Sequence, residues 1–99
     1  KIKRLSRRPD FILKIKDRFI LGEAKFLTDY GGTQNNQFDG ALKITKIKGN
    51  NVSGIAVMDG IVWFKNNSYM HRTVRTTKSI VLGALLLKKF IREQNRAKI

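Results

Sequence analysis

Asp10, Glu23 and Lys25 are two carboxylates and an ammonium group set in a strongly basic part of the sequence. Carboxylate oxygens are the ligands that a hard divalent cation prefers, and a cation held by them polarises water for attack on a phosphate ester. A neighbouring lysine orients that water or stabilises the charge that builds on the phosphate. A surface that only binds polyanions gains nothing from two acids, so these residues indicate a site that hydrolyses a polyanion.

A tight antiparallel hairpin would bring this set together. Residues 11–16 and 19–26 are short and β-prone, and the two residues between them suit a turn. In that register opposed residues have numbers that sum to 35, so Asp10 lies opposite Lys25. Opposed residues share a face, as do alternate residues of one strand, and Glu23 therefore joins them. The other face is predicted to be apolar and half-buried, with Phe11, Leu13, Ile15, Ile20, Ala24 and Phe26.

The middle of the chain predicts a helix followed by buried β structure. Gly31 and Gly32 mark a loop, and Thr33 is a suitable N-cap for a helix over residues 34–47. Two short apolar runs follow, residues 54–58 and 61–64. They fit either a second hairpin, or a buried strand parallel to a neighbour and followed by an edge strand.

The last third of the chain predicts a polar segment and a final helix. Residues 65–78 are polar and basic, which indicates a long loop or an irregular strand. Ser79 is expected to cap a helix that runs to about Glu93 and contributes the stripe Ile80–Leu87 to the core. The positions expected to face the core are Leu82, Leu85, Leu86 and Phe90.

Composition limits the classes of partner. The chain has 99 residues, 41% of them hydrophobic, which suits one small domain. Its formal net charge of +14 attracts phosphate polymers at long range. The basic residues run through all the predicted elements, whereas membrane-surface binding would gather them on one helical face. The absence of cysteine excludes disulfides and thiolate zinc sites, and no apolar run approaches the ~20 residues of a membrane span. We therefore expect a cytoplasmic protein.

Pro9-Asp10, followed by Glu23-Ala24-Lys25, resembles the signature of the PD-(D/E)xK nuclease superfamily. The chain is most similar to type II restriction endonucleases, whose loop and helix after the catalytic strand resemble residues 31–38 here. This resemblance implies an α/β fold of the restriction-endonuclease-like core, a small mixed β-sheet flanked by helices. No clear counterpart of the first helix of that core precedes Asp10. We therefore expect residues 1–99 to form a single nuclease-core domain, as a fragment of a larger chain.

The resemblance also implies roles for individual residues. Asp10 and Glu23 would bind Mg²⁺, the carbonyl of Ala24 would add a ligand, and Lys25 would serve the water and the phosphate. The implied reaction is cleavage of double-stranded DNA, and cutting both strands of a symmetric site favours a homodimer. Residues expected to contact the DNA, from the resemblance or from their charge, are Arg7, Arg8, Gln34, Gln37, Arg72, Arg75 and Lys78.

Other interpretations remain open at this stage. Asp10, Glu23 and Lys25 also fit ordinary exposed residues of a sheet surface. The charge alone fits a noncatalytic nucleic-acid-binding domain, and the same core occurs in Holliday-junction and repair nucleases. The lone His71 is expected to be merely exposed, and Trp63, within an apolar run, is expected to belong to the core.

Overall fold

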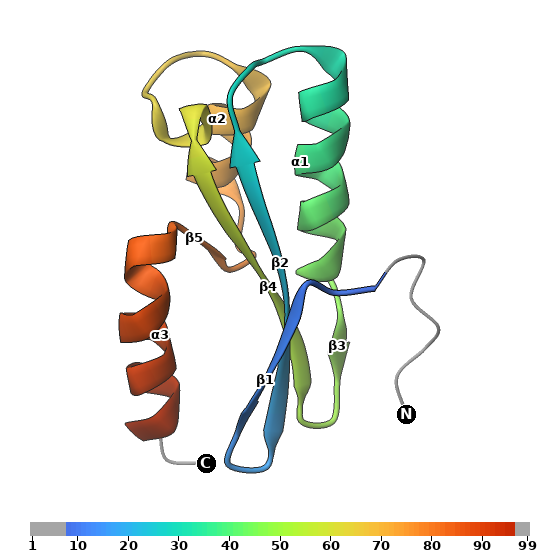
Figure 1. Ribbon diagram of the computed structural model, residues 1–99, viewed down its shortest axis with the longest axis vertical. Helices are drawn as coiled ribbons and strands as arrows, with labels where there is room; N and C mark the ends of the chain where they lie inside the picture. Colours follow the sequence, from blue (N-terminus) through green and yellow to red (C-terminus); the bar gives the residue numbers. More distant parts are fainter. Residues whose placement is uncertain (1–7, 97–99) are drawn as a thin grey trace.

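The computed structural model describes residues 8–96 and builds them around one mixed β-sheet (Figure 1). Strands β1 and β2, and likewise β3 and β4, are antiparallel, whereas β4 is parallel to both β2 and β5. The strand order is β1-β2-β4-β3, and β5 also pairs with β4. The predicted mixed sheet flanked by helices is confirmed. The elements are β1 (Phe11–Ile15), β2 (Arg18–Leu27), α1 (Gly32–Ile44), β3 (Lys48–Gly49), β4 (Val52–Gly60), the 3-10 helix η1 (Ile61–Trp63), α2 (Tyr69–Thr76), β5 (Val81–Leu82) and α3 (Ala84–Arg96).

The hairpin of β1 and β2 forms with a different turn from the one predicted. Ile15 pairs with Arg18, so the turn residues are Lys16 and Asp17. Lys16 has a φ of 57°, a positive value that type II′ turns require at their first central residue. Arg18 donates from Nη2 to the carbonyl of Gln94 in α3 at 3.1 Å. This long-range contact holds Arg18 in the strand, and local turn chemistry does not reveal it.

The correction to the register is a shift of two residues. Paired residues have numbers that sum to 33 rather than 35. Because side chains alternate between faces with a period of two, each one stays on its predicted face. Extending the ladder by one pair places Asp10 opposite Glu23 rather than opposite Lys25.

Strand β4 is the buried parallel strand that one of the two interpretations predicted. Its register with β2 runs from Phe19 opposite Val52 to Leu27 opposite Gly60. Neither the second hairpin nor an edge strand at residues 61–64 forms, because the chain turns into η1. Gly60 has a φ of 98°, and a Cβ there would collide with the carbonyl of Leu27. Both features require glycine at this position, where the strand ends.

Helix α1 begins and ends earlier than the predicted helix over residues 34–47. Its N-cap is Gly31 rather than Thr33, and no side chain caps it. Its C-terminal end lies directly against β4, where a Cβ on Gly54 would collide with the carbonyl of Ile44. Residues 45–47 leave the helix, because their N–H groups donate to the carbonyls three residues earlier rather than four, and β3 begins at Lys48. The buried residues of α1 are Phe38, Ala41 and Ile44.

Helix α2 occupies part of the segment predicted to be a loop or an irregular strand, and that prediction is wrong. Ser68 is its N-cap, and the Ser68 hydroxyl accepts the backbone N–H of His71 at 3.2 Å. Met70 is fully buried, and Val74, one turn later, packs against the same cluster. The helix has only 8 residues, which is shorter than the window of about 11–18 residues over which helical periodicity identifies a helix.

Helix α3 starts at Ala84, four residues later than the helix that Ser79 was expected to cap. Residues 81 and 82 form β5 instead, and the Asp59 carboxylate accepts the N–H of Ala84 at 2.9 Å. Of the four positions expected to face the core, Leu82 and Phe90 do pack against it. The prediction is wrong for the other two, because Leu85 is 97% exposed and Leu86 is 54% exposed. The helix packs through Leu87, Phe90 and Ile91. Among residues 8–96, no helix is long and apolar enough to cross a membrane.

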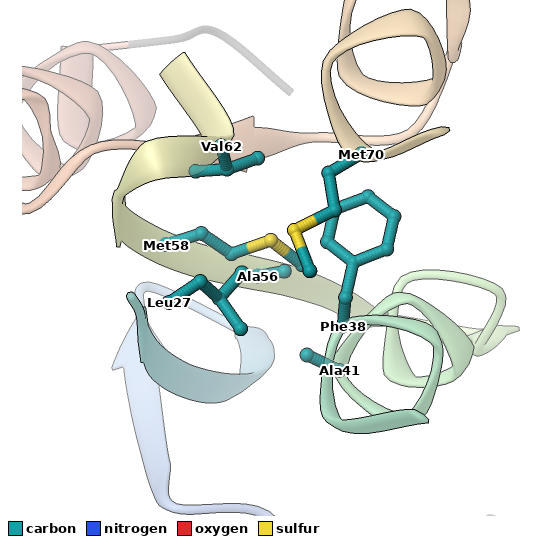
Figure 2. Packing of buried hydrophobic residues seen from close by; sticks show 7 residues of the cluster. All are labelled: Leu27, Phe38, Ala41, Ala56, Met58, Val62 and Met70. Atoms are coloured by element: carbon teal, nitrogen blue, oxygen red, sulfur yellow. The ribbon is translucent and has the colours of Figure 1, made fainter. Parts of the chain in front are cut away.

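Two hydrophobic clusters cover the two faces of the sheet, and β4 supplies alternate residues to each. Ile55 and Val57 face α3, whereas Ala56 and Met58 face α1 and α2. This explains why the sequence of β4 is apolar without interruption. Figure 2 shows the second of these groups, the cluster of Leu27, Phe38, Ala41, Ala56, Met58, Val62 and Met70.

Candidate active site

Asp10 lies immediately before β1, at the edge of β2. Its backbone N–H donates to the carbonyl of Gly22 at 2.8 Å, which extends the hairpin ladder by one residue. Its side-chain Oδ2 accepts the backbone N–H of Ala24, also at 2.8 Å. Asp10 remains exposed. The carboxylate is therefore fixed against the edge of β2, at the point where β1 begins, and stays accessible from solvent.

Glu23 lies in β2 on the face that α1 covers, and it is only 2% exposed. Its Oε2 is 3.7 Å from Nζ of Lys25, whose side chain is 23% exposed. The distance is that of an ion pair and is longer than the ~2.8 Å of a direct charge-assisted hydrogen bond. A buried carboxylate is costly unless an opposite charge offsets the lost hydration. Lys25 contributes an opposite charge. The interpretation of Glu23 as an ordinary exposed residue is wrong.

Ala24 joins the two acids through its backbone. Its N–H points to the β1 side of β2, where Asp10 accepts it. The N–H and C=O of one strand residue point to the same side, so the Ala24 carbonyl faces the same edge as the Asp10 carboxylate. Beyond Gly22, β1 no longer covers this edge. A carbonyl oxygen and a carboxylate therefore lie together where the strand is open.

The oxygen atoms at this edge suit a hard divalent cation. Mg²⁺ uses one or two carboxylates and keeps several waters or substrate oxygens, rather than requiring a cage made only of protein ligands. Asp10, Glu23 and the Ala24 carbonyl match that small ligand set. Within residues 8–96, no group of three or more His, Cys, Asp or Glu side chains is placed to hold a metal.

The face of the hairpin that was predicted to be apolar and half-buried is covered only in part. The expectation is wrong for Ala24 and Phe26. Ile15 and Ile20 are buried, and Phe11 and Leu13 pack against the same cluster. Ala24 is exposed and Phe26 is 69% exposed. Ala24 and Phe26 lie beyond the part of β2 that β1 covers, and α3 packs on that covered part.

The residues predicted to contact DNA and described by the structure come from α1, from α2 and from the segments that precede β1 and β5. Gln34 uses its side-chain Oε1 to accept the backbone N–H of Thr28 at 3.0 Å, which ties the start of α1 to the end of β2. Gln37 is half-buried in α1. Arg8 is exposed just before Asp10, and Arg7 lies outside the described residues. The basic residues Arg72 and Arg75 are exposed on α2, and Lys78 is exposed between α2 and β5.

Several polar residues have structural contacts that the sequence did not indicate. Tyr69 donates from its hydroxyl to Asp39 at 2.5 Å and thereby ties α2 to α1. The pKa of Tyr69 is raised, chiefly by this hydrogen bond and further by burial and by the Asp39 charge. His71, expected to be exposed, is half-buried with Nδ1 3.2 Å from the carbonyl of Val62. Trp63, expected in the core, is 40% exposed and donates to the carbonyl of Met58.

The comparison with protein families gives the class of protein. An α/β core with two acids and a lysine on one strand edge is compatible with a restriction endonuclease. Residues 2–94 match the family described as Tsp45I type II restriction enzyme, and the chain belongs to that family. Comparison with curated proteins and with solved structures finds no match.

Proposed function

We propose that this chain carries a PD-(D/E)xK nuclease site that hydrolyses phosphodiester bonds of double-stranded DNA with Mg²⁺. Membership of a type II restriction enzyme family supports the class of enzyme and a DNA substrate. The formal charge of +14 supports binding to a phosphate polymer. The observation that carries the site is Glu23, a buried carboxylate beside Lys25 and directly across the strand pair from Asp10.

Each residue of the proposed site has a distinct task. Asp10 and Glu23 hold the cation, with the Ala24 carbonyl as a further ligand. When bound, Mg²⁺ supplies Lewis acidity and lowers the pKa of a bound water. Lys25 places a positive charge beside the acids, where it orients the attacking water or stabilises the negative charge of the pentacoordinate phosphate. Burial of the Glu23 side chain excludes water around it, which strengthens these interactions.

Cleavage of both DNA strands suggests the number of copies. A symmetric recognition site has one scissile bond on each strand, related by a two-fold axis. One chain presents one copy of Asp10, Glu23 and Lys25. We therefore expect two chains to act together as a homodimer on one site.

Plasmid cleavage tests this function. The wild-type chain is incubated with supercoiled plasmid in Mg²⁺ and in EDTA, beside Asp10→Asn and Glu23→Gln. We expect discrete fragments only with Mg²⁺, and a loss of about 100-fold or more in each variant, equivalent to about 2.7 kcal/mol of transition-state stabilisation. Asp29→Asn is the matched control, because Asp29 is an exposed acid outside the site and its replacement changes the charge equally.

Three results would count against the proposal. Equal loss of cleavage in Asp29→Asn would remove the special role of Asp10 and Glu23. DNA binding without cleavage in either Mg²⁺ or Mn²⁺ would favour a noncatalytic binding domain. Faster cleavage of four-way junctions than of linear plasmid would favour a junction or repair nuclease of the same core. Circular dichroism of each variant separates loss of chemistry from loss of fold.

A further inference from the structure

A cleft of about 530 Å³ lies at the sheet edge farther from the hairpin. Three stretches line it: residues 45–48 after α1, residues 53–54 of β4, and residues 77–80 between α2 and β5. None of the proposed catalytic residues lines it. The cleft is therefore separate from the candidate active site and has no part in the proposed chemistry.

The cleft exists because two short strands share one edge of β4 without meeting. Strand β3 pairs with residues 52–53 and β5 pairs with residues 56–57. Gly54, between these pairs, is part of the lining. Its missing side chain is also what allows the end of α1 to approach β4, since a Cβ would collide with the carbonyl of Ile44. Packing of the fold itself thus maintains the opening.

The chemistry of the lining favours an anion. Lys46, Lys48 and Lys78, which we call the cleft lysines, all line it and are all exposed. The lining contains no Asp or Glu and includes the hydroxyls of Ser53 and Ser79. Lysine is a compact point charge that binds phosphate, and hydroxyls donate hydrogen bonds to its oxygens.

The C-terminal end of α1 opposes an anion here, and its effect is small. A helix C-terminus carries roughly half a negative charge, located on carbonyls without partners. The last carbonyls of α1 have partners: those of Leu42, Lys43 and Ile44 accept the N–H groups of the next three residues. Three full positive charges therefore outweigh the partial negative charge, and the field in the cleft is positive.

We propose that this cleft binds a backbone phosphate of the DNA, away from the bond that is cut. This inference rests on the proposed function. The edge of β4 is two strand spacings from the far side of β2, roughly 10 Å. Gly54 pairs with Leu21, two residues from Glu23, which adds an offset of roughly 7 Å along the strands. The resulting separation of about 12 Å corresponds to roughly three to four base pairs along a duplex. One duplex can therefore reach both the acids and the cleft. Such a contact fixes the orientation of the DNA without reading its sequence.

The test compares two triple variants with the same charge. The cleft variant combines Lys46→Ala, Lys48→Ala and Lys78→Ala. The control variant removes three other exposed lysines, on α1, after η1 and on α3: Lys43→Ala, Lys65→Ala and Lys89→Ala. Both lower the formal charge from +14 to +11, because each loses three lysines. Fluorescence anisotropy of a labelled duplex in EDTA measures binding over a range of salt concentrations.

We expect the cleft variant to bind DNA about tenfold more weakly than the control variant. The slope of log affinity against log salt should also be flatter by about 0.9 than that of the control variant, since one lost phosphate contact contributes about 0.9. Equal affinities and equal slopes in the two variants would overturn the proposal. The phosphate of a free nucleotide is the other source of this chemistry, and calorimetry with dAMP separates the two. Binding of dAMP that only the cleft variant loses, with DNA affinity equal to that of the control, would also overturn it.

The binding assay contains no metal, so its outcome is independent of cleavage. If the cleft variant loses DNA affinity and the wild-type chain never cuts plasmid, the results support the cleft and contradict the nuclease function. If the wild-type chain cuts plasmid and the cleft and control variants have equal DNA affinities, the results support the nuclease function and contradict the cleft.

Discussion

The ion pair of Glu23 and Lys25 is open to a direct energetic test. Lys25→Met removes the positive charge and keeps a long apolar side chain, Glu23→Gln removes the negative charge at nearly constant volume, and the double variant removes both. We expect Lys25→Met to cost more stability than Glu23→Gln. Glu23 is 2% exposed and its charge would remain unhydrated, whereas the Lys25 side chain is 23% exposed and its ammonium can reach water.

The magnitude follows from the separation of the charges. Two unit charges 3.7 Å apart interact by about 4.5 kcal/mol at an effective dielectric constant of ~20. Partial exposure of Lys25 adds screening, and the pair lacks a direct hydrogen bond, so the measured coupling should be smaller. We expect a coupling free energy of about 1–3 kcal/mol between the two positions, since contacting charges in one network couple on this scale.

Urea denaturation at pH 7 of the wild type and the three variants measures this coupling. The combination of Asp17→Asn with Lys14→Met is the matched control, because both residues are exposed in the same hairpin. A control coupling near zero is expected, since exposed charges contribute little. A coupling below about 0.5 kcal/mol for Glu23 and Lys25 lies within the error of additivity and would refute the account of a buried pair.

Three further predictions concern the elements that position the site. Gly54→Ala should destabilise the chain by about 1–3 kcal/mol in urea denaturation, because the added methyl collides with the carbonyl of Ile44, and an unchanged midpoint would contradict the close contact. Ser68→Ala should lower the free energy of unfolding by about 1 kcal/mol in the same assay, because it removes the N-cap of α2, and an unchanged value would contradict this capping role. The pKa of Tyr69 is raised from its ordinary 10.0, chiefly by the hydrogen bond to Asp39. The raised pKa means that ionisation of Tyr69 opposes folding, so the stability advantage of the wild type over Tyr69→Phe should be complete below pH 10 and decline as the pH rises through the raised pKa. Thermal denaturation from pH 7 to 11 checks this, and an advantage that does not decline in that range argues against the bond.

The hairpin shows what local sequence determines. Alternation of polar and apolar residues was enough to place Asp10, Glu23 and Lys25 on one face, and that placement survives a turn predicted one residue too late. The register itself depended on Arg18, which contacts Gln94 near the other end of the chain. A turn between two β-prone runs has several nearly equivalent solutions, and only the tertiary contact selects one.

The helices show where local patterns fail. Residues 80–87 have a helical spacing of leucines, yet Val81 and Leu82 pair with β4 as a strand. Pairing to a buried strand outweighs intrinsic propensity, and it shifts α3 so that Leu85 is left exposed. Helix α2, by contrast, forms without a long apolar stripe that would predict it. Its stability comes from Ser68 and from burial of Met70.

The composition of the candidate site was predictable from sequence, whereas its environment was not. The spacing of Asp10, Glu23 and Lys25 predicted their proximity, and the structure brings them together. The burial of Glu23 depends on α1 packing over the same face of β2, which no local pattern specifies. The cleft lysines lie in three different segments and lack a common motif, so only the fold brings them together.

The central claim is that Asp10 and Glu23 together bind one divalent cation at the open edge of β2. Electron paramagnetic resonance of Mn²⁺, titrated into the chain with duplex DNA present, tests it most directly. We expect one bound ion per chain, and a loss of affinity of about tenfold or more in Asp10→Asn and in Glu23→Gln, but not in Asp29→Asn. Binding of Mn²⁺ that is unchanged in the first two variants would contradict the claim.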